Sequence, residues 1–263
     1  RKNIGLAPNY LRAVELAEAP YAWILGDDDV FDFSNCTDVI DVIKAGTVDL
    51  IYLSDLGVVG WARETTTTSG HLAKHGSNYF LLLTFVPNFL FRTERFDSQS
   101  LIEGYRSAAN LYPHFPFVNK SVRDDFSFYI SKQKLVYRGE DDNHLSMLTW
   151  LTVWVNNCRT IEDHKMRRAA IYELPYVAQS RIKWLRVVAI SIIAGKMDAP
   201  EKVLPQLRQM MSGLSADQLL LLSLLAPLLL VPSVIYRRLR TLRRARRGKA
   251  FPEASQSTDL FRS

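Results

Sequence analysis

The clearest pattern in the chain is an apolar run that ends in a glycine and three carboxylates. Residues 20–26 read Pro-Tyr-Ala-Trp-Ile-Leu-Gly, and Asp27, Asp28 and Asp29 follow. A short apolar run bounded by glycine predicts a buried strand, and open α/β sheets bind their ligands beyond the carboxyl ends of their strands. The pattern therefore places the three carboxylates at a candidate binding edge.

Helical and strand patterns alternate on both sides of this run. Residues 8–18 have apolar positions at helical spacing, with Pro8 suited to a first turn. Thr37 can cap a helix that ends at Gly46, and residues 48–53 read as another buried strand. This alternation predicts one β-α-β step of an α/β fold with a mixed sheet.

The next part of the chain is less regular. Residues 57–78 are rich in Gly, Thr, Ser and His and predict a long exposed loop that could act as a lid. Residues 79–86 predict a second apolar strand, and Pro87 predicts a break before residues 88–92. Residues 98–110 predict a helix, and residues 134–138 predict a last short strand.

From about residue 143 the pattern becomes helical. Leu148, Leu151, Trp154 and Val155 form an apolar stripe typical of core packing, and residues 176–196 predict another apolar helix. Ser215 and Gln218 match a capping box before the apolar run 219–231. We expect four segments: an α/β domain over residues 1–140, a helical extension over 141–213, a membrane-associating segment over 214–249 and a flexible tail over 250–263.

Composition and charge narrow the class of protein. With 263 residues, 48% of them hydrophobic, the chain can form a full domain with a core and an appendage. The net charge of +6 is local, because eight basic residues lie together at Arg237, Arg238, Arg240, Arg243, Arg244, Arg246, Arg247 and Lys249. The charge balance therefore indicates a basic tail on a nearly neutral body and gives no evidence of a groove along the fold, and no nucleic-acid partner is predicted.

The apolar run and the basic cluster together predict contact with a membrane. Residues 219–231 contain Pro227 and are too short for a spanning helix, which needs about twenty apolar residues. Apolar side chains beside several cations suit an anionic membrane surface. We expect shallow insertion or a re-entrant hairpin over residues 219–249; the alternative is a buried helical hairpin with a solvated basic end. Cys36 and Cys158 suggest neither a zinc site nor a disulfide framework, as in a reducing cytosol.

Three adjacent carboxylates repel one another unless a cation lies among them. Mg²⁺ takes oxygen ligands, often one or two carboxylates together with substrate phosphates. The triplet therefore predicts a metal-diphosphate site. The alternative is a surface turn, in which Asp side chains bind nearby backbone amides.

The motifs in this region resemble one enzyme family. Asn3-x-Gly5, Asn9, Arg12, Ala13, Ala17 and Tyr21-x-Trp23-x-Leu25-Gly26-Asp27-Asp28-Asp29 are together similar to glycosyltransferase family 2, the inverting GT-A enzymes, and within it to the abequosyltransferase-like sugar transferases of bacterial surface polysaccharide and O-antigen synthesis. The similarity is clear over residues 1–55 and weaker as far as about residue 140.

The resemblance implies a GT-A (Rossmann-like) fold and a nucleotide-sugar donor whose diphosphate is held through Mg²⁺ or Mn²⁺. By position, Asn3, Gly5, Asp27 and Asp28 would bind the donor, while Asp29, with Asp27, would bind the metal. Because the sequence begins at Arg1 with the helix before the acidic strand, the family's first strands, which grip the nucleobase, are expected to be missing, which makes the catalytic domain N-terminally truncated.

An inverting transfer needs a base that takes the proton of the attacking hydroxyl. Within the segment where the family has its base, we favour His114, in a Tyr-Pro-His turn, because the unperturbed pKa of histidine lies near working pH. The family more often uses an acid there, so Asp124, Asp125 and Glu103 also remain candidates. His71 and His75, four residues apart, have no obvious third ligand and are interpreted as a solvated pair.

The predicted function is sugar transfer from a nucleotide-diphosphate donor to a lipid-linked glycan or polysaccharide acceptor. The enzyme would be cytoplasmic and peripheral to the inner face of a bacterial cell membrane. The alternative is a non-enzymatic membrane-associated scaffold in which the acidic triplet is only a turn. A phosphohydrolase that uses Asp-x-Asp is less well supported, because Val30 and Phe31 stand where such enzymes usually have Gly or Thr.

Overall fold

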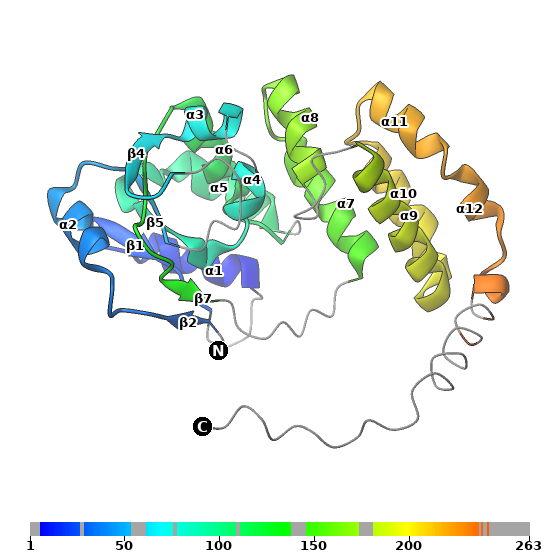
Figure 1. Cartoon of the computed structure of the whole chain (residues 1–263), viewed down its shortest axis with the longest axis horizontal. Coiled ribbons are helices and arrows are strands. Elements are labelled where there is room, and N and C mark those ends of the chain that lie inside the picture. The colour runs from blue at the N-terminus through cyan, green and yellow to red at the C-terminus, as the bar shows by residue number, and fades with distance from the viewer. Residues whose placement is uncertain are drawn as a thin grey trace, which may run out of the picture.

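The computed structural model describes residues 6–26, 29–53, 62–75, 78–108, 111–137, 146–173, 181–236, 238 and 241. Its first half contains a mixed sheet and its second half is helical (Figure 1). The strands are β1 (Tyr21–Trp23), β2 (Val30–Phe31), β3 (Leu50–Tyr52), β4 (Thr65–Thr68), β5 (Phe89–Arg92), β6 (Ser127–Ile130) and β7 (Val136–Tyr137). The helices are α1 (Leu6–Glu15), α2 (Thr37–Ala45), α3 (Ser69–His75), α4 (Tyr79–Leu82), η1 (Val86–Asn88), η2 (Thr93–Arg95), α5 (Ser98–Arg106), α6 (Phe115–Arg123), α7 (Met147–Cys158), α8 (His164–Glu173), α9 (Arg181–Asp198), α10 (Pro200–Met211), α11 (Ala216–Ser223) and α12 (Ala226–Leu230).

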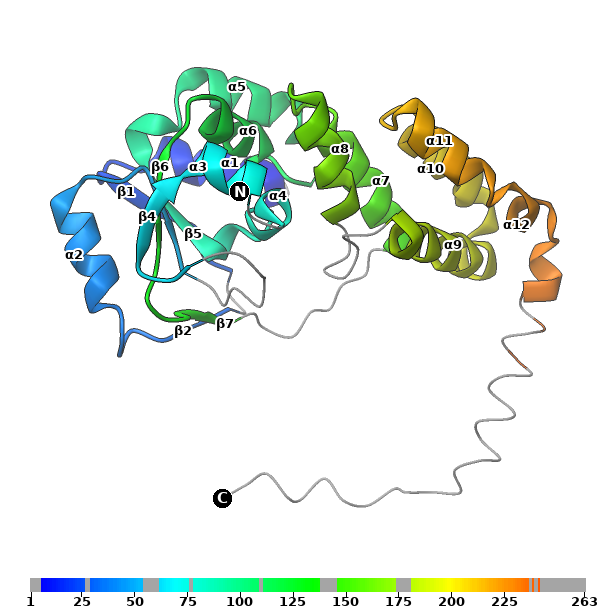
Figure 2. The ribbon, with the colours of Figure 1, turned by 45° about the horizontal axis from the view of Figure 1, so that its top comes forward.

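The five-stranded sheet has the order β1-β5-β3-β6-β4. Strands β3 and β6 pair in parallel, while β5 pairs antiparallel with both β1 and β3. Strands β1, β3 and β6 therefore run in one direction, and their carboxyl ends share one edge. Strands β2 and β7 form a separate two-stranded sheet, seen below the main sheet in Figure 2. The α/β prediction is confirmed, whereas β1 is a half-buried outer strand among those described and not a buried one.

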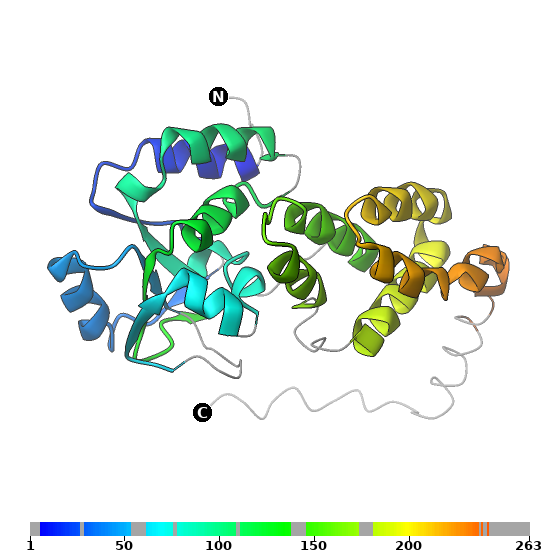
Figure 3. The same ribbon diagram turned by 90° about the horizontal axis from the view of Figure 1, so that it is seen from above.

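Alternation along the strands divides the core between the two faces of the sheet. Leu50, Tyr52, Phe89 and Phe91 face the main core beneath α1 and α3–α6. Ile51 and Leu90 face a smaller cluster closed by α2 and the β2–β7 pair. Side chains that point alternately to opposite faces explain why one apolar strand supplies both layers. Figure 3 shows α1 and α5 side by side on the main face.

The main core continues into the helical half of the chain. The stripe predicted on α7 is buried, and Trp154 packs edge-to-face against Phe115 of α6. At the end of α8, Glu173 Oε2 accepts a hydrogen bond from the N–H of Leu81 in α4 at 2.9 Å. Leu222 of α11 belongs to the same core. One continuous apolar interior therefore joins the sheet to the helices.

Several helix predictions are confirmed. The predicted helices at 8–18, from Thr37 to Gly46, at 98–110 and at 176–196 correspond to α1, α2, α5 and α9, although residues 176–180 lie outside the described chain. Gly46 ends α2 at φ +60°. The cap itself differs, because Cys36 takes the N-cap position and Thr37 is already helical. The capping box of Ser215 and Gln218 opens α11 as expected.

Two predictions between the strands are wrong. Of the predicted loop 57–78, the described part contains β4 and α3, because Thr65–Thr68 pairs with β6. The predicted strand 79–86 is instead the short helix α4 followed by turns. Tyr79, Phe80, Leu81 and Leu82 are all buried, and an apolar run enclosed on every side has no period that separates strand from helix. Sequence analysis also missed β6 and α6.

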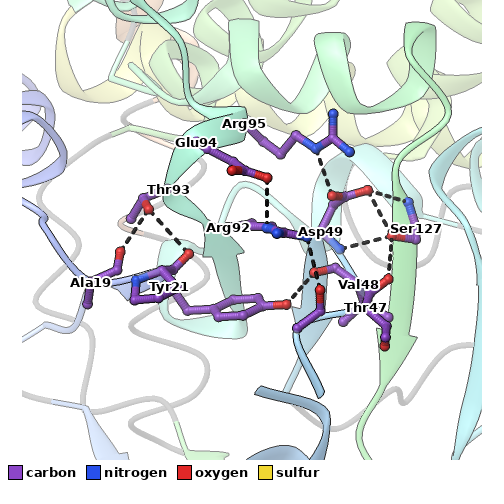
Figure 4. A network of polar contacts seen from close by, with 12 residues as sticks. Ala19, Tyr21, Thr47, Val48, Asp49, Arg92, Thr93, Glu94, Arg95 and Ser127 are labelled. Carbon is purple, nitrogen blue, oxygen red and sulfur yellow. Dashed lines mark hydrogen bonds and ion pairs between the residues drawn. The ribbon is translucent and has the colours of Figure 1, made fainter. Parts of the chain in front are cut away.

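The edge of the sheet opposite the carboxyl ends of β1, β3 and β6 is closed by paired polar groups (Figure 4). Asp49, just before β3, receives the Arg95 Nε–H at 2.7 Å and the N–H and Oγ–H of Ser127 at 2.9 and 2.8 Å. Arg92 donates to the Gly46 carbonyl at 3.0 Å. These bonds join the starts of β3 and β6 to the end of β5.

The apolar segment after the capping box forms two short helices, α11 and α12. Leu220, Leu224 and Leu230 expose 72%, 68% and 83% of their surfaces. Over the part of the chain that the structure describes, no helix is long and apolar enough to cross a bilayer. Both cysteines are free thiols.

Candidate functional site

A pocket of about 470 Å³ lies at the carboxyl end of β1. Four segments form it: α1, the turn after β1, the turn that leads into η1, and residues 111–114 before α6. The indole N–H of Trp23 donates to the Pro87 carbonyl at 3.0 Å and so fixes the end of β1 against η1. The lining includes Asn9, Tyr10, Ile24, Leu25, Gly26, Asp29, Thr84, Val86, Tyr112 and His114.

The acidic turn contributes one described carboxylate to this pocket. Asp29 is half-buried, and its Oδ2 accepts a hydrogen bond from the Gly26 N–H at 3.2 Å. This is the turn contact that the alternative interpretation expects. A carboxylate can make such a contact and bind further donors or an ion as well, since its two oxygens offer about four acceptor sites. Asp27 and Asp28 lie outside the described residues, as do Asn3 and Gly5.

His114 lies in the wall of the same pocket, at the N-cap position of α6. Its side chain is 1% exposed, and its Nε2 is 2.9 Å from the Leu83 carbonyl oxygen. Burial lowers the pKa of His114 to about 4, although the hydrogen bond to Leu83 acts in the opposite direction. The imidazole is therefore neutral at pH 7, with the proton on Nε2. The general-base prediction had assumed an unperturbed pKa.

Two polar atoms in the wall of the pocket have no hydrogen-bond partner in the described chain. They are His114 Nδ1 and the Tyr10 hydroxyl, whose rings are 5.4 Å apart. Burial raises the pKa of Tyr10 well above its ordinary value. A neutral imidazole nitrogen accepts a hydrogen bond and a phenol can donate one. Together they offer an acceptor and a donor to a hydroxylated ligand.

The other proposed bases lie elsewhere. Asp124 pairs with Arg123 at 3.0 Å, and Asp125 Oδ1 accepts from the Gly70 N–H at 2.9 Å. Both residues follow α6 and precede β6, at the edge of the sheet opposite the pocket. Glu103 lies on α5 and lines a different pocket. The structure thus brings Asp29 and His114 together and leaves these three acids away from them.

No metal cluster is formed by the described residues. Within that set, no group of three or more His, Cys, Asp or Glu side chains could hold an ion. His71 and His75 lie on α3 with ring centroids 4.9 Å apart, so they share a helical face and not the loop that was predicted. A magnesium site of one or two carboxylates completed by substrate phosphates requires fewer protein ligands than such a group.

Sequence analysis missed Tyr10, Thr84 and Leu111 as pocket residues. Tyr10 follows Asn9, which belongs to the motif that carries the family resemblance. Its place in the predicted helix was the signal that could have identified it as a pocket residue. Thr84 lies in the turn after α4, and Leu111 has φ +64°, which the residue type does not indicate.

Comparisons of the chain with protein-family models, with curated proteins and with solved structures gave no match. The family resemblance therefore stays a prediction.

Proposed function

We propose that the protein is an inverting, metal-dependent glycosyltransferase with a GT-A fold. It would transfer a sugar from a nucleotide-diphosphate donor to a lipid-linked or polysaccharide acceptor at the inner membrane face. One observation carries the proposal: Asp29 and His114, predicted as site residues 85 positions apart, line one pocket at the carboxyl end of β1. A pocket of this size suits a sugar.

The residues of the pocket suggest how the reaction would be arranged. The acceptor oxygen would bond to the anomeric carbon while the bond from that carbon to the diphosphate oxygen breaks. His114 Nδ1 would accept the hydrogen bond of the attacking hydroxyl and then its proton, since the ring is neutral at pH 7. Tyr10 would orient a sugar hydroxyl.

The carboxylates of the acidic turn fit a divalent ion. Asp29, together with Asp27, would hold Mg²⁺ or Mn²⁺ by its oxygens, and substrate phosphates would complete the ligand set. When bound, such an ion neutralises the charge of the departing diphosphate.

Donor binding tests this proposal directly. Calorimetry with a panel of UDP-, GDP- and dTDP-sugars in Mn²⁺ should detect binding that Asp29→Asn weakens at least about tenfold, as expected for loss of a charged contact. Asp41→Asn removes an exposed carboxylate of α2 outside the pocket and should change nothing. Absence of binding to every donor, or equal effects of both variants, would overturn the proposal.

The exposed leucines of α11 and α12 support the membrane part of the proposal. A leucine that leaves water gains about 1.5–3 kcal/mol, so Leu220→Ser with Leu224→Ser should weaken binding to anionic vesicles by tenfold or more. Ile182→Ser with Ile190→Ser removes equally exposed apolar groups from α9 and is the matched control. Equal loss in both pairs would contradict a specific membrane-facing segment.

The same surface favours a second candidate, a membrane-associated scaffold without catalysis. In that case Asp29 only closes its turn through Gly26, and no nucleotide sugar binds. Vesicle flotation that depends on Leu220 and Leu224, combined with failure of every donor in calorimetry, would favour the scaffold.

A further inference from the structure

A second polar pocket, of about 300 Å³, lies between α8 and the turn that precedes α11. Figure 1 shows this turn beside α8, on the side away from the sheet. Its lining is rich in hydrogen-bond donors and positive charge: Arg159, Arg167, Arg168, Ser212, Ser215 and Gln218. His164 also lines it. None of these residues belongs to the pocket of Asp29 and His114.

Positive charge exceeds negative charge in this pocket. Arg168 is paired, with its Nη2 2.5 Å from Asp217 Oδ2. Arg159 Nη1 donates to the Ser212 hydroxyl at 3.0 Å, and Arg167 Nη2 donates to the Glu162 backbone carbonyl at 3.2 Å. Among the described residues, neither of these two guanidiniums forms an ion pair with a carboxylate. Two positive charges therefore face the pocket uncompensated.

The backbone of the turn before α11 packs closely against one of these arginines, Arg159. At Gly213, an added Cβ would lie 3.0 Å from both Cγ and Cδ of Arg159 and 2.7 Å from a methyl group of Val155. The glycine thus allows the turn before α11 to pack directly on the arginine side chain and brings the N-terminus of α11 to the pocket.

Two buried donors in this lining have no acceptor in the described part of the chain. They are Arg167 Nε and Gln218 Nε2, and the Gln218 side chain is fully buried. Gln218 Oε1 accepts from the N–H and the hydroxyl of Ser215, at 3.0 and 2.9 Å, which fixes the orientation of the amide. A buried donor without a partner is unfavourable, so an acceptor-rich ligand would complete the pocket.

We propose that this pocket binds a phosphate group. A phosphate offers several acceptor oxygens and the negative charge that two guanidiniums and a helix N-terminus favour. The inference is independent of sugar transfer. The phosphate could belong to a soluble molecule or to a lipid headgroup, because α11, which begins at the pocket, bears the exposed Leu220 and is followed by the exposed Leu224.

The test measures binding of named phosphates to the full chain. Calorimetry with inorganic phosphate and pyrophosphate, and flotation with phosphatidylcholine vesicles containing phosphatidic acid, cover the two sources. Arg167→Gln should weaken binding at least about tenfold. Lys165→Gln removes the same charge from an exposed position of α8 outside the pocket and should leave binding unchanged.

A second variant separates loss of the site from loss of the fold. Gln218→Glu keeps the oxygen that accepts from Ser215 and replaces the unpartnered donor with a second, negatively charged acceptor in the pocket that the arginines line. It should abolish phosphate binding while the melting temperature stays the same or rises. Arg167-dependent binding of pyrophosphate would support a soluble ligand, and Arg167-dependent flotation alone would support a lipid headgroup. If neither probe distinguishes Arg167→Gln from Lys165→Gln, the proposal is wrong.

Discussion

The two edges of the sheet differ in whether their buried polar groups have hydrogen-bond partners. At the edge where β3 and β6 begin, Asp49 is 5% exposed and its carboxylate accepts hydrogen bonds from Arg95 and from Ser127. At the other edge, the Tyr10 hydroxyl and His114 Nδ1 are buried without partners in the described chain. The first arrangement stabilises the fold, whereas the second leaves hydrogen-bonding capacity for a ligand.

The pKa values follow the same division. Burial alone would raise the pKa of Asp49, but the hydrogen bonds from Arg95 and Ser127 hold it below its usual value. Burial dominates at two other positions: in the pocket wall it lowers the pKa of His114 to about 4, and at the end of α8 it raises that of Glu173 to about 8. Both latter groups favour their neutral forms. Ionising either group in the folded state costs free energy. The free energy of unfolding should therefore change with pH, in a direction that can be measured for each group.

The largest effect is expected at the paired edge. Asp49→Ala would leave the part-buried Ser127 N–H without an acceptor and Arg95 without its carboxylate, so the free energy of unfolding should fall by about 3 kcal/mol. Arg95→Ala, at a half-exposed partner, should cost about 1 kcal/mol. Urea denaturation measures both. A loss below that of Arg95→Ala would show that the network contributes little.

Glu173 should give the next largest effect. Its raised folded-state pKa means that its contribution to stability is fully present below about pH 4.5 and is lost as pH rises towards about 8. Glu173→Gln keeps an acceptor for the Leu81 N–H and cannot ionise, so above pH 8 it should be more stable than the wild type by at least about 2 kcal/mol, since one pKa unit corresponds to about 1.4 kcal/mol. The difference should vanish near pH 4.5.

Denaturation across this pH range tests the Glu173 prediction. Glu162→Gln, at an exposed position just before α8, should leave the pH dependence unchanged. A Glu173→Gln curve parallel to the wild type throughout would mean that this carboxyl titrates normally.

His114 should respond to pH with the opposite sign. Because its folded-state pKa is lowered, its contribution is present above about pH 6.5 and is lost as pH falls towards about 4. His114→Phe keeps an aromatic ring beside Tyr10 and Phe89 but leaves the Leu83 carbonyl unpaired, at about 1 kcal/mol near pH 7. On acidification the wild type should lose this contribution and the variant should not, so the deficit should shrink below pH 6.5 and reverse towards pH 4. A constant difference would contradict a neutral buried imidazole.

The patterns that could be predicted from the sequence were those with a local cause. Gly46 stops α2, Ser215 and Gln218 open α11, and the apolar run 20–26 contains β1. The helix at Tyr79–Leu82 could not be predicted, because burial on every side removes the period. Strand β6 could not be predicted either, because it forms by pairing with β3. Its Tyr129 lies beside Ile51, which is far away in the sequence.

The candidate site also combines features that have a local cause with features that depend on long-range contacts. Asp29 was found through a local motif, and His114 through a turn. Their meeting in one pocket depends on the pairing of β1 with β5, a long-range contact that no local pattern encodes. The lowered pKa of His114 likewise results from side chains on α1 and β5 that enclose its ring.

The smallest effect tests the comparison between the edges most directly. Tyr10→Phe removes a buried hydroxyl that has no partner in the described chain, so it should change the free energy of unfolding by less than about 0.5 kcal/mol, or raise it. Tyr79→Phe is the matched control: its hydroxyl is also buried but lies 2.8 Å from the Ser121 hydroxyl, and its loss should cost about 1 kcal/mol or more. Both changes remove one oxygen from a ring in the same core, so packing cancels in the comparison. Equal costs in urea denaturation would mean that the Tyr10 hydroxyl is already satisfied, and the pocket would then lose the donor assigned to its ligand.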